Sequence, residues 1–151
     1  MTDTVPATDK NLDAACTSVA NEIARTDGKA SLLLAFNGVV LAGLASIADT
    51  DLPAVTKTAG ALAVLALGAA AVLLLLVVRP RLRADDRASF PYWARLDEDG
   101  IRSCMEADNR AARIRVLSTL AVRKYLHLRW AVDLSLAALA LLALAAAGLA
   151  L

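Results

Sequence analysis

The sequence has few of the side chains that carry catalysis or bind metal ions. It contains one histidine, His127, and two cysteines, Cys16 and Cys104, which lie far apart in polar segments. No CxxC motif or His/Cys cluster is present, so neither a zinc site nor a disulfide is expected. The chain also has no P-loop and no GxGxxG motif. We therefore expect a protein that is not an enzyme, with no catalytic residues, no metal and no cofactor.

Aromatic residues are also scarce, at 4% of the chain, whereas apolar residues make up 58% of it. Leucine, alanine and valine dominate, and they gather in long runs instead of recurring at the spacing of a soluble core. The N-terminal stretch MTDTVPATDK is acidic and polar and has no basic n-region directly before an apolar run, so a cleaved signal peptide is not expected. No run typical of a β-strand and no internal repeat is found. The composition therefore predicts an all-α membrane protein.

Three apolar runs are long enough to cross a bilayer. Each has about 19–21 residues, which at about 1.5 Å per residue matches a hydrocarbon core of roughly 30 Å. The expected spans are residues 30–48, 58–78 and 131–151, and a short polar loop at residues 49–57 joins the first two. The sequence therefore predicts a multi-pass protein of a cell membrane with three transmembrane helices.

The segments outside these spans predict its orientation. Residues 79–129 are rich in arginine, and the positive-inside rule places such a segment in the cytoplasm. Residues 1–29 are then cytoplasmic as well, whereas the loop at residues 49–57 and the end of the chain lie outside. We expect the first and third spans to continue into cytoplasmic helices, the second of which starts at about Ile101.

Each cytoplasmic helix is expected to carry an apolar stripe that packs on the other helix. In the first helix the stripe is formed by residues at spacings of four, three and four, namely Leu12, Cys16, Val19 and Ile23. In the second helix the expected stripe consists of Met105, Ala112, Val116 and Leu120.

Three residues in or near the spans are candidates for packing or switching. Gly28 lies where the first cytoplasmic helix meets the bilayer and is a candidate joint. Asn37 lies within the first span, beside small residues four apart that favour either packing between the chain's own spans or dimerisation. Asp133 lies about one turn inside the third span, where a carboxylate needs a partner or water. The partners expected at its depth are Lys29, Arg79 and Arg129.

Positive charge is expected to converge at the cytoplasmic ends of all three spans. Such cations often only contact lipid phosphates. However, a carboxylate and a tyrosine accompany them, a mixture that suits a ligand with both a phosphate and a base. The candidate ligand-binding residues are Arg25, Asp27, Lys29, Arg79, Lys124, Tyr125 and Arg129.

The same segments resemble a known family. The stretch ARTDGKASLL at residues 24–33 resembles the "A-D-x-K-A-S-x-L-L" opening of the membrane effectors of Pycsar antiphage systems. Arg79-Pro80-Arg81-Leu82 after the second span is similar to the family too, as is Lys124-Tyr125 with Arg129 ahead of the third span. The middle segment matches only loosely, and the resemblance extends from about Asp9 to Leu151.

The resemblance implies a function and partners. Such effectors accompany a cyclase that makes cyclic UMP or cyclic CMP on infection, and the nucleotide is thought to activate the membrane protein. The activated effector impairs the bacterial inner membrane and halts growth of the infected cell. We do not expect the extra enzymatic domain that some relatives carry. We therefore expect a non-enzymatic effector that binds a cyclic pyrimidine nucleotide, forms a homo-oligomer in the bilayer and does not bind nucleic acid. The alternative is a non-gated membrane scaffold or partner-binding subunit that uses its basic cytoplasmic face.

Overall fold

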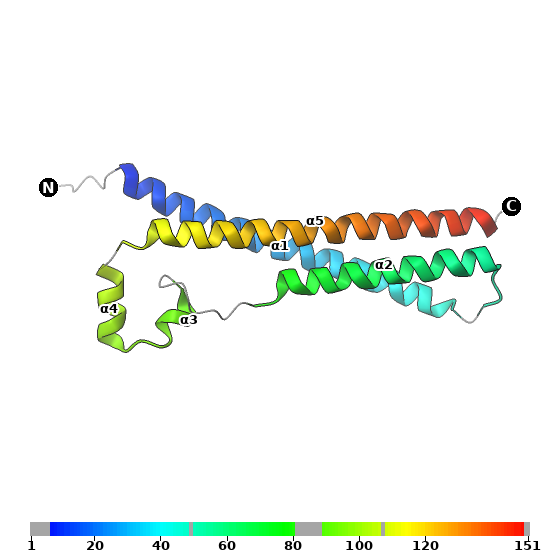
Figure 1. Cartoon of the computed structure of the whole chain (residues 1–151), viewed down its shortest axis with the longest axis horizontal. Helices are drawn as coiled ribbons and strands as arrows, with labels where there is room; N and C mark the ends of the chain where they lie inside the picture. Colours follow the sequence, from blue (N-terminus) through cyan, green and yellow to red (C-terminus); the bar gives the residue numbers. More distant parts are fainter. Residues whose placement is uncertain (1–6, 49, 81–88, 107, 150–151) are drawn as a thin grey trace. The chain divides into compact units, whose positions relative to one another are not determined.

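Every regular element among the described residues is a helix. The computed structural model describes residues 7–48, 50–80, 89–106 and 108–149. In chain order the helices are α1 (Ala7–Ser46), α2 (Ala54–Val78), α3 (Phe90–Trp93), α4 (Glu98–Glu106) and α5 (Arg110–Leu149) (Figure 1). Residues 1–6 of the expected cytoplasmic segment, Arg81 of the motif that resembles the family, and the last two residues of the expected third span lie outside the described residues.

Helices α1, α2 and α5 are long and apolar enough to cross a membrane. The prediction of an all-α chain with three candidate membrane-spanning helices is therefore confirmed. α1 and α5 have 40 residues each, about twice the length that a bilayer core requires. Both therefore continue well beyond a single span, and α1 passes through Gly28 without interruption.

The chain between the second and third spans differs from the single helix expected from about Ile101. α4 ends at Glu106 and α5 begins at Arg110. The Asp108 carboxylate accepts a hydrogen bond from the backbone N–H of Arg110 at 3.1 Å. A side chain that satisfies a free amide at a helix start favours initiation at that point. The capping interaction of Asp108 accounts for the separate start of α5.

The chain divides into two compact units, which are described separately. The first contains residues up to Arg25 together with Pro80–Arg123, and the second contains Thr26–Arg79 together with Lys124–Leu151. The second unit thus includes α2 and the C-terminal parts of α1 and α5, and it holds the three apolar runs.

In the second unit, the buried positions on each helix follow a seven-residue repeat with alternating steps of three and four. This spacing is typical of helices that pack nearly side by side with interlocking side chains. The fully buried positions on α2 illustrate it: Ala63, Leu67, Ala70, Leu74 and Val77. On α5 the repeat runs through Leu128, Ala131, Ser135, Ala138 and Ala145. Many of these residues are alanine, which lets helix backbones approach closely in a membrane.

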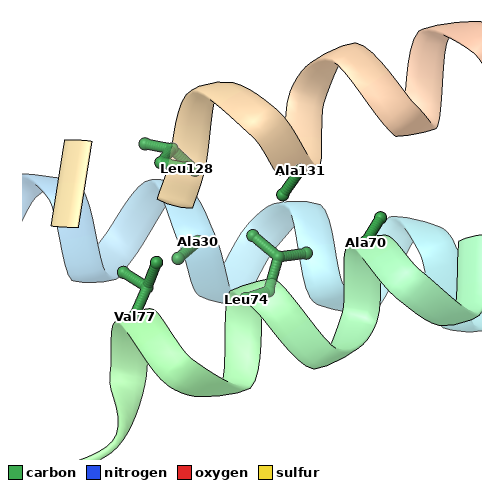
Figure 2. Close-up of a cluster of buried hydrophobic side chains, with 6 residues drawn as sticks. All are labelled: Ala30, Ala70, Leu74, Val77, Leu128 and Ala131. Atoms are coloured by element: carbon green, nitrogen blue, oxygen red, sulfur yellow. The ribbon is translucent and has the colours of Figure 1, made fainter. Parts of the chain in front are cut away.

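Two apolar clusters show how the three helices of this unit run. The first joins Ala30 of α1 to Leu74 of α2 and Ala131 of α5, and Figure 2 shows these side chains pointing into the space between the helices. The second cluster contains Ala63 of α2 and Ala138 of α5, with residues near the end of α1 packed against it. α2 is therefore antiparallel to α1 and α5, which run parallel to each other.

The first unit joins the start of α1 to the start of α5 through Arg110. Its guanidinium contacts Asp9 at 2.5 Å and Asp13 at 3.2 Å on α1, as well as Asp108 at 2.9 Å. The hydrogen bonds from the side chain and then the backbone N–H of Arg110 hold the pKa of Asp108 below its ordinary value. Asp108 is therefore ionised at neutral pH and balances the charge of Arg110.

The prediction of which residues form the apolar stripe on the second cytoplasmic helix is wrong. Met105 belongs to α4, and both Met105 and Val116 are exposed. The more sheltered positions on α5 are Ile114, Leu117 and Ala121, which share the seven-residue repeat of the span. On α1, by contrast, the four expected stripe residues are all half-buried.

Candidate functional site

An ion pair joins α1 to α5 at the point where their apolar runs begin. The Lys124 amine donates to both carboxylate oxygens of Asp27, at 2.5 and 2.7 Å. The Lys124 side chain is only 12% exposed and that of Asp27 is 35% exposed. Because this site is largely shielded from water, the attraction between the two charges is stronger than at an open surface. The pair therefore holds the two helices together at one end of the second unit.

The helices position this pair through their buried repeat. Lys124 is four residues before buried Leu128, and Asp27 directly follows buried Thr26 on α1. Lys124 therefore takes a position on α5 that an apolar residue would otherwise fill. Burial of a lysine there is tolerated because the carboxylate of Asp27 satisfies its charge.

A second polar contact joins the same two helices deeper in the apolar region. Asn37 is fully buried and its side-chain amide donates to the Ser135 hydroxyl at 2.9 Å. The Ser135 hydroxyl in turn donates to the carbonyl of Ala131, also at 2.9 Å. The side-chain oxygen of Asn37 is buried and has no hydrogen-bond partner among the described residues. The contact is therefore only partly satisfied.

Three of the exposed cations of the predicted site lie near one depth of the second unit. Lys29 precedes Ala30, Arg129 follows Leu128, and Arg79 lies two residues after Val77. Ala30, Leu128 and Val77 meet in the first apolar cluster. The cations are exposed, so they point away from that cluster.

The other predicted site residues lie in different surroundings. Tyr125 is 38% exposed and follows Lys124 directly. Gly28 is exposed and a Cβ placed there would meet nothing within 4 Å, so its small size is not required for packing inside the chain. Arg25 belongs to the first unit, where its side chain is exposed and pairs with Glu22 at 3.7 Å.

Asp133 differs most from expectation. The sequence predicts a partner for it among Lys29, Arg79 and Arg129, but it forms no ion pair or hydrogen bond with any described residue. It is exposed, whereas Ala131 and Ser135 on either side of it are buried. Helical geometry explains the difference, because two residues along a helix correspond to a rotation of about 200°. Asp133 therefore faces away from the bundle.

Two residues of these contacts were not identified from the sequence, and a signal for both was present. Ser135 and Thr26 are polar residues inside or at the border of apolar runs, and both occupy positions of the seven-residue repeat. A polar residue in phase with buried alanines and leucines is expected to face the core.

Comparison with known families identifies the chain. The model of the Pycsar effector protein domain matches residues 11–151, which covers all three candidate spans. No curated protein and no solved structure matches the chain significantly. A match over nearly the whole chain shows the family, in agreement with the resemblance of the segments around Asp27, Arg79 and Lys124. The chain therefore belongs to the Pycsar effector family, whose members are effectors of antiphage defence in the membrane.

Proposed function

We propose that this effector is activated by a cyclic pyrimidine nucleotide, cyclic UMP or cyclic CMP, and then impairs the bacterial inner membrane. The observation that supports this proposal most directly is the ion pair of Lys124 with Asp27. A sheltered lysine that already binds one anion is chemically suited to bind another, and a cyclic nucleotide carries one negatively charged phosphate. Exchange of the Asp27 carboxylate for the phosphate would couple binding to separation of α1 and α5.

The neighbouring residues suit the remainder of such a ligand. Lys29, Arg79 and Arg129 offer exposed charge at the same depth as the apolar cluster beside the pair. Tyr125 offers a ring and a hydroxyl for the base. In this proposal the nucleotide comes from the cytoplasm, where a partner cyclase makes it.

Binding of the nucleotide is expected to depend on these cations. A hydrogen bond to a charged group contributes about 1.5–3 kcal/mol, so Lys29→Ala or Arg129→Ala should weaken binding roughly 10- to 150-fold. Isothermal titration of the purified full chain in detergent with cyclic UMP, cyclic CMP and cyclic AMP measures this directly. Lys57→Ala, at the opposite end of α2, is the matched control and should bind like the parent.

Two results would argue against this site. If Lys29→Ala and Arg129→Ala bind like the parent while Arg95→Ala does not, the nucleotide binds to the segment between α2 and α5. If no cyclic nucleotide binds at all, the alternative of a non-gated scaffold, which uses its basic face for lipid or protein, is favoured.

The proposed site also requires a particular orientation in the membrane. With the arginine-rich segment in the cytoplasm, a reporter inserted near Glu98 should be cytoplasmic and one fused after Leu151 should be periplasmic. A pair of reporters active in opposite compartments, such as alkaline phosphatase and a fluorescent protein, distinguishes the two locations. The reverse pattern would place Lys124 and Asp27 on the side away from the cyclase and would exclude direct activation.

A further inference from the structure

The outward face of α5 contains two opposite charges. Ala131, Ser135 and Ala138 are buried, and they define the face of α5 that packs in the bundle. Arg129 and Asp133 are exposed and lie on the opposite face, because Asp133 is rotated by about 200° from both Ala131 and Ser135. Apolar residues flank the two charges along this face: Leu126 is 50% exposed and Leu136 is 59% exposed.

This arrangement is unfavourable for a single chain in a bilayer. Charged residues within membrane-spanning helices almost always face the interior of a bundle or a water-filled space. Asp133 does neither in the bundle of this chain, and no described residue neutralises it. Asp133 is about 6 Å deeper than Arg129, at one helical turn of separation. The face thus presents to its surroundings a carboxylate that an assembly of several chains would cover.

We propose that α5 of a second, parallel copy of this chain covers this face, so that Arg129 of one copy binds Asp133 of the next. In parallel copies like charges lie at the same depth, so the pairing forms when each Arg129 side chain extends one turn along the axis to Asp133 of the other copy. An arginine side chain is long enough to reach one turn along the helix axis. Leu126 and Leu136, on either side of the charged pair, supply apolar contact.

The assembly places Asp133 of every copy at one depth beside the axis between the copies. Neither charge is satisfied in a single chain, so the site is complete only when two copies contribute. The inference depends on insertion of α5 into the membrane and describes the assembly before nucleotide binds. In that assembly Arg129 binds Asp133 of the next copy, and it contacts a nucleotide only when the copies move apart. The interface also gives the effector a polar position between copies at which water can enter when they move apart.

Cross-linking in native membranes tests which face of α5 meets the second copy. In a full chain with Cys16→Ser and Cys104→Ser, Leu136→Cys places a thiol on the proposed face. Oxidation should convert this variant into a disulfide-linked dimer. Leu134→Cys is the matched control, because it lies within two residues of the same depth but is rotated by about 160° from Leu136 and packs against the apolar cluster of its own chain. It should remain largely monomeric on a non-reducing gel.

Reversal of single charges tests the pairing itself. Arg129→Asp leaves two anions on the face and Asp133→Arg leaves two cations, so each variant alone should lose the oligomer on size-exclusion chromatography with light scattering. Co-expressed with different affinity tags, the two variants should co-purify, because each then meets a partner of opposite charge. Co-purification is measured without nucleotide and tests only the interface, whereas nucleotide binding by Lys29→Ala tests only the proposed ligand site. Either proposal can therefore fail while the other holds.

The opposite results would overturn the interface. A parent chain that elutes at the mass of one 15.8 kDa protein and gives no cross-link at Leu136→Cys would place Asp133 against lipid headgroups or water. Equal cross-linking of Leu136→Cys and Leu134→Cys would show random collision. Failure of the two charge variants to co-purify, with normal insertion of each, would exclude the pairing of Arg129 with Asp133.

Discussion

Asp27→Asn is expected to depolarise bacterial membranes without any cyclic nucleotide. The substitution keeps the shape of the side chain but removes the charge that binds Lys124, whose side chain is only 12% exposed. Removing one partner of a sheltered ion pair costs roughly 2–4 kcal/mol, since the remaining charge is left unpaired. In the proposed mechanism this cost destabilises only the closed arrangement, because separation of α1 and α5 returns Lys124 to water.

The size of the effect follows from the balance between the two arrangements. About 5.5 kcal/mol shifts an open fraction from about 1% to about 99%. From the same starting point, roughly 2 kcal/mol gives an open fraction of about one quarter, and roughly 4 kcal/mol gives about nine-tenths. Asp27→Asn should therefore replace between about one quarter and about nine-tenths of the effect of the activating nucleotide.

A membrane-potential dye in cells that lack the cyclase measures this prediction. Asp51→Asn, in the loop at the opposite end of the bundle, is the control and should retain the parent potential. Exchange of the two charges, Asp27→Lys with Lys124→Asp, re-forms an ion pair and should restore the closed behaviour. If Asp27→Asn cells keep the parent potential at equal expression, the ion pair does not hold the closed state.

Asn37→Leu is expected to have the opposite effect, because it should stabilise the closed bundle. The side-chain oxygen of Asn37 is buried without a hydrogen-bond partner among the described residues. An unsatisfied buried polar group costs about 1–3 kcal/mol, and leucine has the same branched shape as asparagine with no polar atoms. Combination with Ser135→Ala also removes the hydroxyl that Asn37 contacts. The double variant should unfold at a higher temperature and respond less to the activating nucleotide.

Thermal unfolding in detergent and depolarisation with the cyclase present are the two measurements. Leu44→Met conserves volume at a half-buried apolar position on α1 and should change neither of them. A lower unfolding temperature for the double variant would show that the contact stabilises the bundle despite its unsatisfied oxygen. An unchanged response to nucleotide would show that activation leaves this contact intact.

The transmembrane helices could be predicted because they depend on a local and strong property. An apolar run of about 20 residues has no better environment than a bilayer core. The break between α4 and α5 could not be predicted from periodicity, since it depends on capping by Asp108. The apolar residues of each span did not reveal which face is buried, because leucine and alanine occur both at the core and at the lipid. An apolar pattern cannot separate two apolar surroundings.

The candidate site was predicted in composition but not in arrangement. Asp27 and Lys124 were both selected for their charge, yet their pairing depends on how α1 and α5 pack across most of the chain. Asp133 was expected in the interior because a carboxylate in a span needs a partner. It faces outward because the phase of the helix is set by Ala131 and Ser135.

The alternating steps of three and four on α1 and α5 have a consequence for how these two helices can move. If only apolar contacts are considered, a slide of α1 along α5 by seven residues, about 10 Å, would re-form many of the same packing contacts between the two helices. Such a slide would set Asn37 against an apolar residue instead of Ser135, and it would also separate Asp27 from Lys124. The two polar contacts therefore allow a single register among several that the alanines and leucines would accept. Tilting or rotation in place disturbs the polar contacts without losing this register, so the bundle can return to the same closed arrangement.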